Sequence, residues 1–252
     1  PLGSKDVAVE DNDAVNRIIH ENIPDVVINC AAIANPEICE KDPDLAYRVN
    51  SIGAGNIAAA CQDIGSKYVY ISTDHIFDGY KGSPYTEFDE PCPVNTYGRS
   101  KLAGEKFTAN LCNRYFIIRT SILFGIHRDT FVTKSIREAK ELKKVAAPSD
   151  QMVSPTYVKD LAYMIRELVE KNAYGIYHLT NKGVCSRYDL AKKALCIAGY
   201  DEVEVIPVLS DFTGKAQRPL NVALDNYRVK LMGHICARSW EEALEDFITN
   251  EC

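Results

Sequence analysis

Asp25-Val-Val-Ile-Asn-Cys-Ala-Ala32 is a short apolar run that follows a proline. Such a run predicts a strand buried on both faces, as in a parallel sheet. Two more runs of this kind follow along the chain, Tyr68-Val-Tyr-Ile-Ser72 and Tyr115-Phe-Ile-Ile-Arg-Thr120. Helical patterns separate the three runs, so the order of elements predicts an α/β fold with a Rossmann-like, doubly wound parallel sheet.

Cap residues mark the helices between these strands. Apolar residues recur at helical spacing in residues 13–20. Asp42 and Pro43 are typical of the cap and the first turn of a second helix, which we expect to end at Gly65. A third helix is predicted from Tyr97 to about residue 110.

The C-terminal half predicts a less regular order of elements. Its helices are expected at residues 158–169, 186–198 and 238–248, and its short strands at 175–179 and 203–207. We expect about residues 155–179 to return to the main sheet. The predicted division is a dinucleotide-binding domain of residues 5–120 and 155–180, and a smaller interleaved substrate domain of residues 121–154 and 181–252.

Composition excludes several classes of function. The 252 residues carry a formal net charge of −6, and an acidic surface repels the phosphate backbone of nucleic acids. No apolar run reaches the roughly 20 residues that a membrane span needs. The nine cysteines form no CxxC pair and no cluster with histidine, so we expect reduced, mostly buried thiols in a cytoplasmic protein without a metal site.

The strongest local motif is Tyr97-Gly98-Arg99-Ser100-Lys101. A Tyr and a Lys four residues apart share one face of a helix. The nearby ammonium is expected to favour the phenolate, which suits the Tyr for proton transfer to a carbonyl that receives a hydride. Thr73 follows the preceding strand, so its hydroxyl is expected to meet the same oxygen.

The same spacing occurs a second time, at Tyr188 and Lys192. No strand that ends in a hydroxyl residue precedes this pair. We therefore interpret it as a solvent-facing side of a helix.

One expected element is missing from the sequence. A dinucleotide fold begins with a strand, a glycine-rich turn and a helix, and the sequence contains no such unit. Its first residues, Pro1-Leu2-Gly3-Ser4, resemble the remnant of a cleaved affinity tag or the tail of a glycine-rich loop.

Motifs along the chain resemble the dTDP-4-dehydrorhamnose reductase family, in the sugar-nucleotide branch of the extended short-chain dehydrogenases/reductases. The motifs are Ile28-Asn-Cys-Ala-Ala32, Ile71-Ser-Thr-Asp-His-Ile-Phe-Asp-Gly79, Asn95-Thr-Tyr-Gly-Arg-Ser-Lys-Leu-Ala-Gly-Glu105, Arg119-Thr-Ser-Ile-Leu-Phe-Gly125, Asp150-Gln-Met-Val-Ser-Pro-Thr156 and Gln217-Arg-Pro219. The resemblance covers essentially all residues from Asp6 onward.

The resemblance implies roles for individual residues. Tyr97 matches the proton donor, Lys101 its partner at the nicotinamide ribose, and Thr73 the contact to the sugar C4 oxygen. Asp74 matches a sugar-binding position, and Arg218 a contact to the nucleotide phosphates. The residues expected to line the cofactor are Tyr97, Lys101, Ser72 and the stretch Ala31, Ala32 and Ile33.

Two positions depart from the family pattern. His75 stands where the family usually has Tyr, and Ile122 where it often has Trp. Both are expected near the sugar, so the resemblance leaves the exact sugar nucleotide open.

The resemblance implies reduction of the 4-keto group of a nucleotide-linked deoxy sugar, dTDP-4-dehydrorhamnose, by NADPH or NADH. It also allows a homodimer. Two alternatives stay open: a non-catalytic regulatory subunit of the methionine adenosyltransferase β type, and a related sugar-nucleotide epimerase.

Overall fold

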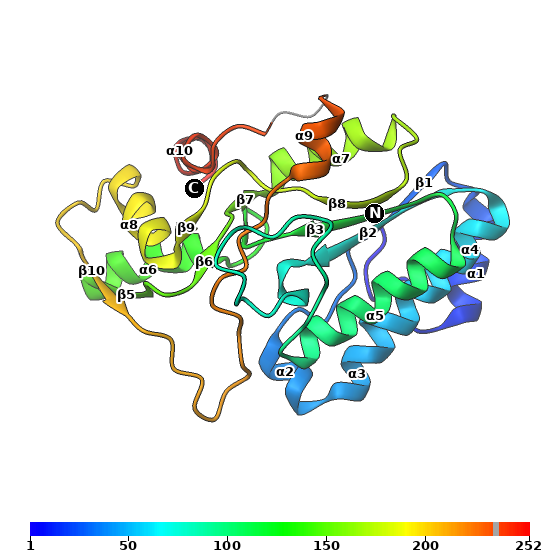
Figure 1. Cartoon of the computed structure of the whole chain (residues 1–252), viewed down its shortest axis with the longest axis horizontal. Coiled ribbons are helices and arrows are strands. Elements are labelled where there is room, and N and C mark those ends of the chain that lie inside the picture. Colours follow the sequence, from blue (N-terminus) through cyan, green and yellow to red (C-terminus); the bar gives the residue numbers. More distant parts are fainter. Residues whose placement is uncertain (234–236) are drawn as a thin grey trace.

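The computed structural model describes residues 1–233 and 237–252. Its main sheet has four parallel strands in the spatial order β1-β2-β3-β8 (Figure 1). These strands are β1 (Val26–Asn29), β2 (Lys67–Thr73), β3 (Tyr115–Thr120) and β8 (Gly175–His178). The predicted α/β class with a parallel sheet is therefore confirmed.

Helices cover both faces of this sheet (Figure 1). One face carries α1 (Asn12–Asn22), α4 (Gly53–Ile64) and α5 (Thr96–Leu111), and the other carries α7 (Val158–Val169) and α9 (Tyr227–Met232). The alternation along β2 explains this arrangement, because successive strand residues point to opposite faces. Tyr68 and Tyr70 lie in the cluster with α1 and α4, whereas Val69 lies in the cluster with α7.

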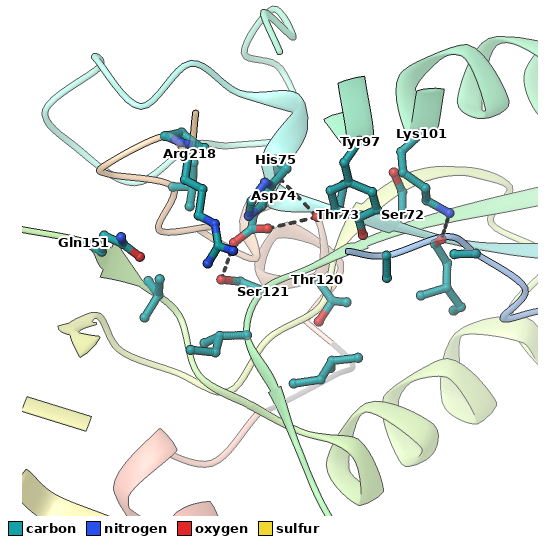
Figure 2. A pocket seen from close by; sticks show the side chains of 18 of the residues that line it. Ser72, Thr73, Asp74, His75, Tyr97, Lys101, Thr120, Ser121, Gln151 and Arg218 are labelled. Atoms are coloured by element: carbon teal, nitrogen blue, oxygen red, sulfur yellow. Dashed lines mark hydrogen bonds between the residues drawn. The ribbon is translucent and has the colours of Figure 1, made fainter. Parts of the chain in front are cut away.

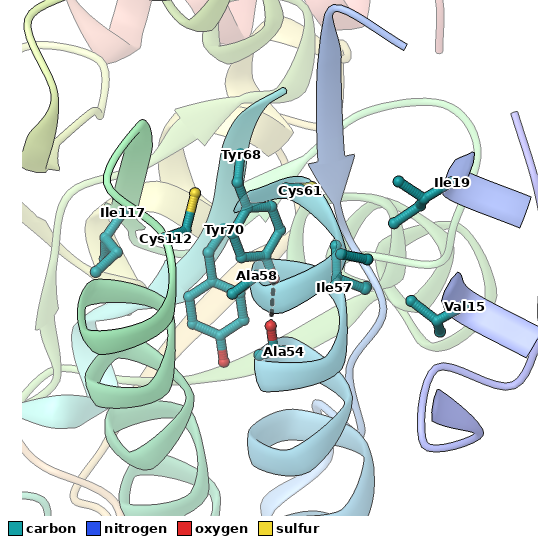
Figure 3. Packing of buried hydrophobic residues seen from close by; sticks show 11 residues of the cluster. Val15, Ile19, Ala54, Ile57, Ala58, Cys61, Tyr68, Tyr70, Cys112 and Ile117 are labelled. Atoms are coloured by element: carbon teal, nitrogen blue, oxygen red, sulfur yellow. Dashed lines mark hydrogen bonds between the residues drawn. The ribbon is translucent and has the colours of Figure 1, made fainter. Parts of the chain in front are cut away.

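Figure 3 shows the first of these clusters, in which Tyr68 and Tyr70 pack beside small residues of α4. The hydroxyl of Tyr68 donates to the carbonyl of Ala54 over 3.2 Å, so the buried phenol keeps a hydrogen-bond partner. Val15 and Ile19 of α1 complete the cluster from the far side of α4.

The segment from residue 36 to residue 65 is helical almost throughout. It comprises α2 (Pro36–Lys41), α3 (Pro43–Tyr47), a π-helical stretch (Arg48–Ile52) and α4. Asp42 caps α3 by accepting from the backbone of Leu45, and Gly65 ends α4 at a φ of 73°, as predicted. Helix α2, which Asn35 caps, was not predicted from the sequence.

A smaller group of elements lies at one end of the main sheet (Figure 1). It contains α6 (Phe131–Leu142), β5 (Lys144–Pro148), α8 (Arg187–Ile197), β10 (Glu204–Val208) and α10 (Trp240–Asn250). Two further pairs of short strands are β4 (Leu123–Phe124) with β7 (Thr156–Tyr157), and β6 (Met152–Val153) with β9 (Cys185–Ser186). Buried aromatic side chains, including Phe124, Trp240 and Phe247, pack at its centre.

Two sequence expectations about the first strand are wrong. β1 pairs only with β2 among the described strands, so it lies at the sheet edge and Ile28 is 52% exposed. Cys30 follows β1 and is exposed, instead of being buried within a strand. The eight cysteines of the described chain are free thiols, but the expectation that most are buried is wrong. Four are buried, Cys39, Cys61, Cys112 and Cys185, and four are exposed, Cys30, Cys92, Cys196 and Cys252.

None of the helices in the described ranges is both long and apolar enough to cross a membrane.

Candidate active site

A cavity opens beyond the carboxyl ends of β2 and β3, where parallel sheets place their ligands. Thr73 is the last residue of β2, and Asp74 and His75 follow in a short 3-10 turn (Asp74–Ile76). Tyr97 and Lys101 line the same cavity from α5 (Figure 2). The structure thus brings together all five residues that the sequence placed at the reacting end of the site.

The start of α5 is held tightly against the turn after β2. Asn95 caps the helix, because its side-chain oxygen accepts from the backbone N–H of Gly98 over 2.8 Å. Gly98 packs on the carbonyl of His75, where a Cβ would collide with that oxygen. Gly104, further along α5, similarly packs on Asn50 and Tyr70. This close approach fixes Tyr97 beside Thr73.

Lys101 is buried, and it lies one helical turn after Tyr97 on α5. Its Nζ donates to the carbonyl of Ile71 over 2.6 Å and lies 3.9 Å from the centre of the Tyr70 ring. Burial lowers the pKa of Lys101 to about 7, although the Glu105 carboxylate acts in the opposite direction. The charge of Lys101 therefore changes near neutral pH when no ligand is bound.

The expected effect of Lys101 on Tyr97 is not found. Burial raises the pKa of Tyr97 to about 12, with the Thr73 hydroxyl acting in the opposite direction. The ammonium of Lys101 is directed at the Ile71 carbonyl, so burial of the phenol decides the shift. Tyr97 consequently keeps its proton at neutral pH, which is the state that a proton donor needs.

Asp74 is a buried carboxylate with two hydroxyl donors. Thr73 Oγ1 donates to its Oδ1 over 3.0 Å, and Ser121 Oγ donates to its Oδ2 over 2.5 Å (Figure 2). The Thr73 proton is therefore directed at Asp74 in the absence of ligand. A ligand oxygen beside Thr73 has to turn this hydroxyl away from Asp74 in order to accept from it.

His75 is held as a neutral ring. Its Nδ1 lies 3.2 Å from the side-chain nitrogen of Asn95, and its ring meets that of Tyr97 edge-on with centroids 5.4 Å apart. Burial lowers the pKa of His75, and the charges of Arg187 and Arg218 lower it further, against the opposing effect of Asp74.

Arginine side chains reach the cavity from three separate segments. Arg218 was predicted from the sequence, whereas Arg128 and Arg187 were not, although both line the same cavity. Gln151 lines the cavity too, on the same side of Tyr97 as Arg218 (Figure 2). No local pattern in the sequence marks Arg128 or Arg187, because they converge only through the tertiary fold.

The stretch predicted to line the cofactor is only partly at the cavity. Ala32 lines it, whereas Ala31 and Ile33 do not. Ile33 instead exchanges two hydrogen bonds with the side chain of Asn50, at 2.8 and 3.1 Å. Asn50 is buried and also donates to Ser100 on α5, so its side chain links the loop after β1 to the helix of Tyr97.

Ser72 and Ile122 also line the cavity. The Ser72 hydroxyl donates to Glu105 over 2.5 Å, and Glu105 forms a buried ion pair with Arg119 at 2.8 Å. The hydroxyl proton of Ser72 is therefore directed at Glu105 and away from a ligand. Ile122 follows β3 with a φ of 23°, an unfavourable backbone conformation for a β-branched residue.

Tyr188 and Lys192 lie elsewhere. They line a small surface hollow on α8, together with Tyr200 and Val205. No strand of the main sheet ends there, which agrees with the interpretation of this pair as a surface feature.

The residues at the cavity fit the nicotinamide end of a dinucleotide. The small side chains of Cys30, Ala32 and Ala34 leave room beyond β1, and Lys101 lies next to Tyr97 at the same opening. No group of three or more His, Cys, Asp or Glu residues suited to a metal ion occurs within residues 1–233 and 237–252.

A parallel sheet with a Tyr and a Lys on one helix face beyond its carboxyl edge defines the class: this is a Rossmann-like fold of the short-chain dehydrogenase/reductase kind. The model of the family described as the RmlD substrate binding domain matches residues 1–252, and the chain belongs to this family.

Individual relatives agree with this assignment. The chain is 36% identical to dTDP-4-dehydrorhamnose reductase of Mycolicibacterium smegmatis, over 98% of this chain and 76% of that protein. Its structure is similar to that of dTDP-4-dehydrorhamnose reductase from Bacillus anthracis in complex with NADP, with a TM-score of 0.94 and 41% identity over 99% of this chain and 88% of that one. It is also 32% identical to methionine adenosyltransferase 2 subunit beta of Rattus norvegicus, over 88% of this chain and 69% of that protein.

Proposed function

We propose that the protein reduces the 4-keto group of a nucleotide-linked deoxy sugar, converting dTDP-4-dehydrorhamnose to dTDP-rhamnose with NADPH or NADH. The observation that carries this proposal is the place of Tyr97. Its protonated phenol lines the cavity between Lys101 on one side and Asp74 and Arg218 on the other (Figure 2). The relatives named as dTDP-4-dehydrorhamnose reductases support the choice of substrate.

The roles of the site residues follow from this placement. Tyr97 donates the proton to the C4 oxygen, and Thr73 donates a hydrogen bond to the same oxygen once its hydroxyl turns from Asp74. Lys101 holds the nicotinamide ribose, and Ala32 borders the cofactor. Asp74, His75 and Ile122 contact the sugar, and Arg218 the phosphates.

The reaction balances as one hydride and one proton added to a carbonyl. Bound NADPH or NADH would supply the hydride to carbon 4, and the carbonyl π electrons would become the electron pair on oxygen that takes the Tyr97 proton. The C4 carbonyl becomes an alcohol, and solvent restores the phenol proton. The raised pKa of Tyr97 keeps the proton available before the hydride moves.

The direct test is product formation by the full-length protein. dTDP-4-dehydrorhamnose and NADPH are incubated with the enzyme, and the sugar nucleotide is analysed by NMR. Appearance of dTDP-rhamnose at a rate proportional to enzyme supports the proposal. If no NADPH is oxidised and the sugar nucleotide stays unchanged, the proposal is rejected.

The similarity to methionine adenosyltransferase 2 subunit beta favours a second candidate, a regulatory binding subunit. The two candidates differ in turnover, because a regulatory subunit binds nucleotide without converting the sugar. An epimerase differs in another way, since it returns its nicotinamide cofactor unchanged.

We also propose the domain division expected from the sequence. Pairing of β8 with β3 supports the assignment of residues 155–180 to the cofactor domain with residues 5–120. Residues 121–154 and 181–252 would form the sugar-nucleotide domain. A homodimer is proposed from the family resemblance alone, and light scattering of the full-length protein would test it.

A further inference from the structure

Arg187 is a partly buried arginine at the cavity that the proposed reaction does not yet use. It is the first residue of α8, and its backbone N–H donates to the carbonyl of Gln151 over 3.0 Å. Its guanidinium lies 5.2 Å from the centre of the Phe131 ring and lines the cavity.

The Nε of Arg187 is buried and has no hydrogen-bond partner within the described ranges. Arg187 also forms no ion pair with any described carboxylate, whereas Arg119, a buried arginine near the site, pairs with Glu105. A buried guanidinium nitrogen without a partner is unfavourable, and arginine donors match carboxylate and phosphate oxygens in geometry. The side chain is therefore arranged for an anion that enters the cavity.

The charge of the cavity wall indicates which anion fits. Arg128, Arg187 and Arg218 line the cavity together with Lys101, and Asp74 is the carboxylate among the lining residues. Apart from Lys101, which lies beside Tyr97, and Glu37, which lies 3.8 Å from Arg218, the three arginines against Asp74 leave an excess of two positive charges. A diphosphate that joins a sugar to a nucleoside carries one negative charge on each phosphate, so it would balance them.

The order of residues across the cavity fixes where this anion would lie. Figure 2 shows Lys101 and Arg218 on opposite sides of Tyr97, with Asp74 and His75 on the side of Arg218. Arg187 lines the same cavity as His75 and Arg218, and the charges of both arginines lower the pKa of His75. A ligand with its carbonyl at Tyr97 therefore has its sugar beside His75 and its anionic group beyond it.

The two arginines differ in their present surroundings. Arg218 Nη2 lies 3.8 Å from Glu37 and its side chain is about one third exposed, so it exchanges a weak surface contact for the ligand. Arg187 has no such ion pair to give up, and its guanidinium already lies against the Phe131 ring with its Nε buried. Pre-orientation lowers the cost of binding.

We infer that Arg187 is the principal specificity-determining residue for the diphosphate of the substrate, acting together with Arg218 as a clamp on a nucleoside diphosphate. The inference rests on the proposed function for the choice of a nucleotide sugar. Binding of a nucleoside diphosphate needs no turnover, so the two proposals fail in different experiments.

The experiment is calorimetric titration of the full-length protein with dTDP and, separately, with thymidine, which lacks the phosphates. Arg187→Gln should weaken dTDP binding by about 10- to 100-fold, the usual effect of losing a charged hydrogen bond. Binding of thymidine should change less than about 2-fold. The matched control is Arg137→Gln, because Arg137 is an exposed arginine on α6 that pairs with Asp129 on the surface; it should leave dTDP binding unchanged.

Arg187→Lys provides a second variant should Arg187→Gln fail to fold. Lysine keeps the charge but loses the fork of the guanidinium, so the loss of dTDP affinity should be about 10-fold or less and still measurable. In the enzyme assay, KM for the sugar nucleotide should rise while kcat changes little, because Arg187 does not contact the reacting atoms.

Several results would overturn the inference. Equal dTDP affinity in wild type and both Arg187 variants would show that the diphosphate lies elsewhere. Weaker NADPH binding with unchanged dTDP binding would place a cofactor phosphate at Arg187 instead. If the wild type binds dTDP through Arg187 but does not reduce the 4-keto sugar, the clamp stands and the proposed function fails.

Discussion

Asn95 donates a hydrogen bond from its side-chain nitrogen to Nδ1 of His75 over 3.2 Å. The direction of this bond is set by the fold, since the Asn95 oxygen caps α5 by accepting from Gly98 and its nitrogen also donates to the Gln217 carbonyl over 2.8 Å. His75 Nδ1 therefore has no proton, and the ring proton is on Nε2. The start of the catalytic helix thus fixes which ring nitrogen of His75 can donate to a sugar.

Replacing Asn95 with Asp should shift the His75 ring from its neutral form toward its charged form. Asn95→Asp keeps an oxygen for the Gly98 cap but sets a carboxylate against Nδ1, which favours the charged ring. The pKa of His75 should rise, because a carboxylate beside Nδ1 stabilises the charged ring. NMR titration of the imidazole protons, with His75→Gln to assign the signal, measures this shift. Asn113→Asp, at an exposed position, is the control; the same His75 pKa in both variants would show that Asn95 does not set the tautomer.

His75 and Ile122 are expected to tune the choice of sugar nucleotide. A Trp at 122 would offer a flat ring face, and stacking of this kind adds roughly 0.5–1.5 kcal/mol. We expect Ile122→Trp to raise kcat/KM for dTDP-4-dehydrorhamnose relative to other 4-keto sugar nucleotides, and His75→Tyr to change the ranking among them. The measurement is kcat/KM for several 4-keto sugar nucleotides with the wild type and both variants. If dTDP-4-dehydrorhamnose is the best substrate before and after both changes, neither position determines specificity.

Tyr97→Phe separates the two Tyr–Lys pairs of the chain. It should lower turnover by about 10² to 10⁴, as for the loss of a general acid, and leave nucleotide binding nearly intact. Tyr188→Phe, on α8, should change turnover little because its surface hollow is apart from the cavity. Steady-state kinetics on both variants test this choice, and equal losses would contradict it.

His178 should make the fold sensitive to acid. It is buried, its Nδ1 donates to the carbonyls of Tyr85 and Asp225, and burial lowers its pKa to about 3. Below its free value of about 6.5 the unfolded chain binds a proton that the folded chain does not, so stability falls as pH falls toward 3. At pH 5 this loss is about 2 kcal/mol.

Urea unfolding between pH 7 and pH 5 measures the effect. His178→Gln should be less stable at pH 7 but should show a shallower decline with falling pH than the wild type. His75, whose pKa is also lowered, contributes in the same direction and remains in both proteins. Parallel pH dependences for the two proteins would mean that His178 is not the sensitive group.

The sequence predicted those elements whose apolar pattern is strong. The strand at residues 115–120 and the helix at 158–169 have the expected bounds, because their buried positions are filled by large apolar residues. Helix α6 was missed because two of its three buried positions are Ser135 and Ala139. Burial of these small residues depends on neighbours that no local pattern reveals.

The candidate site shows the same limit. Tyr97, Lys101 and Thr73 could be predicted to lie together because strand ends and helix starts meet at one edge of a parallel sheet. Arg187 could not, because it reaches the cavity from an element outside that sheet. The raised pKa of Tyr97 was also beyond prediction, since it depends on burial and on the direction in which Lys101 points.

Transfer of deuterium from NADPH to the sugar tests the central claim most directly. The full-length protein is given dTDP-4-dehydrorhamnose and NADPH that carries deuterium at the transferring position of the nicotinamide, and the product is analysed by NMR. The account predicts dTDP-rhamnose with deuterium at carbon 4 and a proton from solvent on the C4 oxygen, at a rate that Tyr97→Phe greatly reduces. Unlabelled sugar, or label at another carbon, would contradict it.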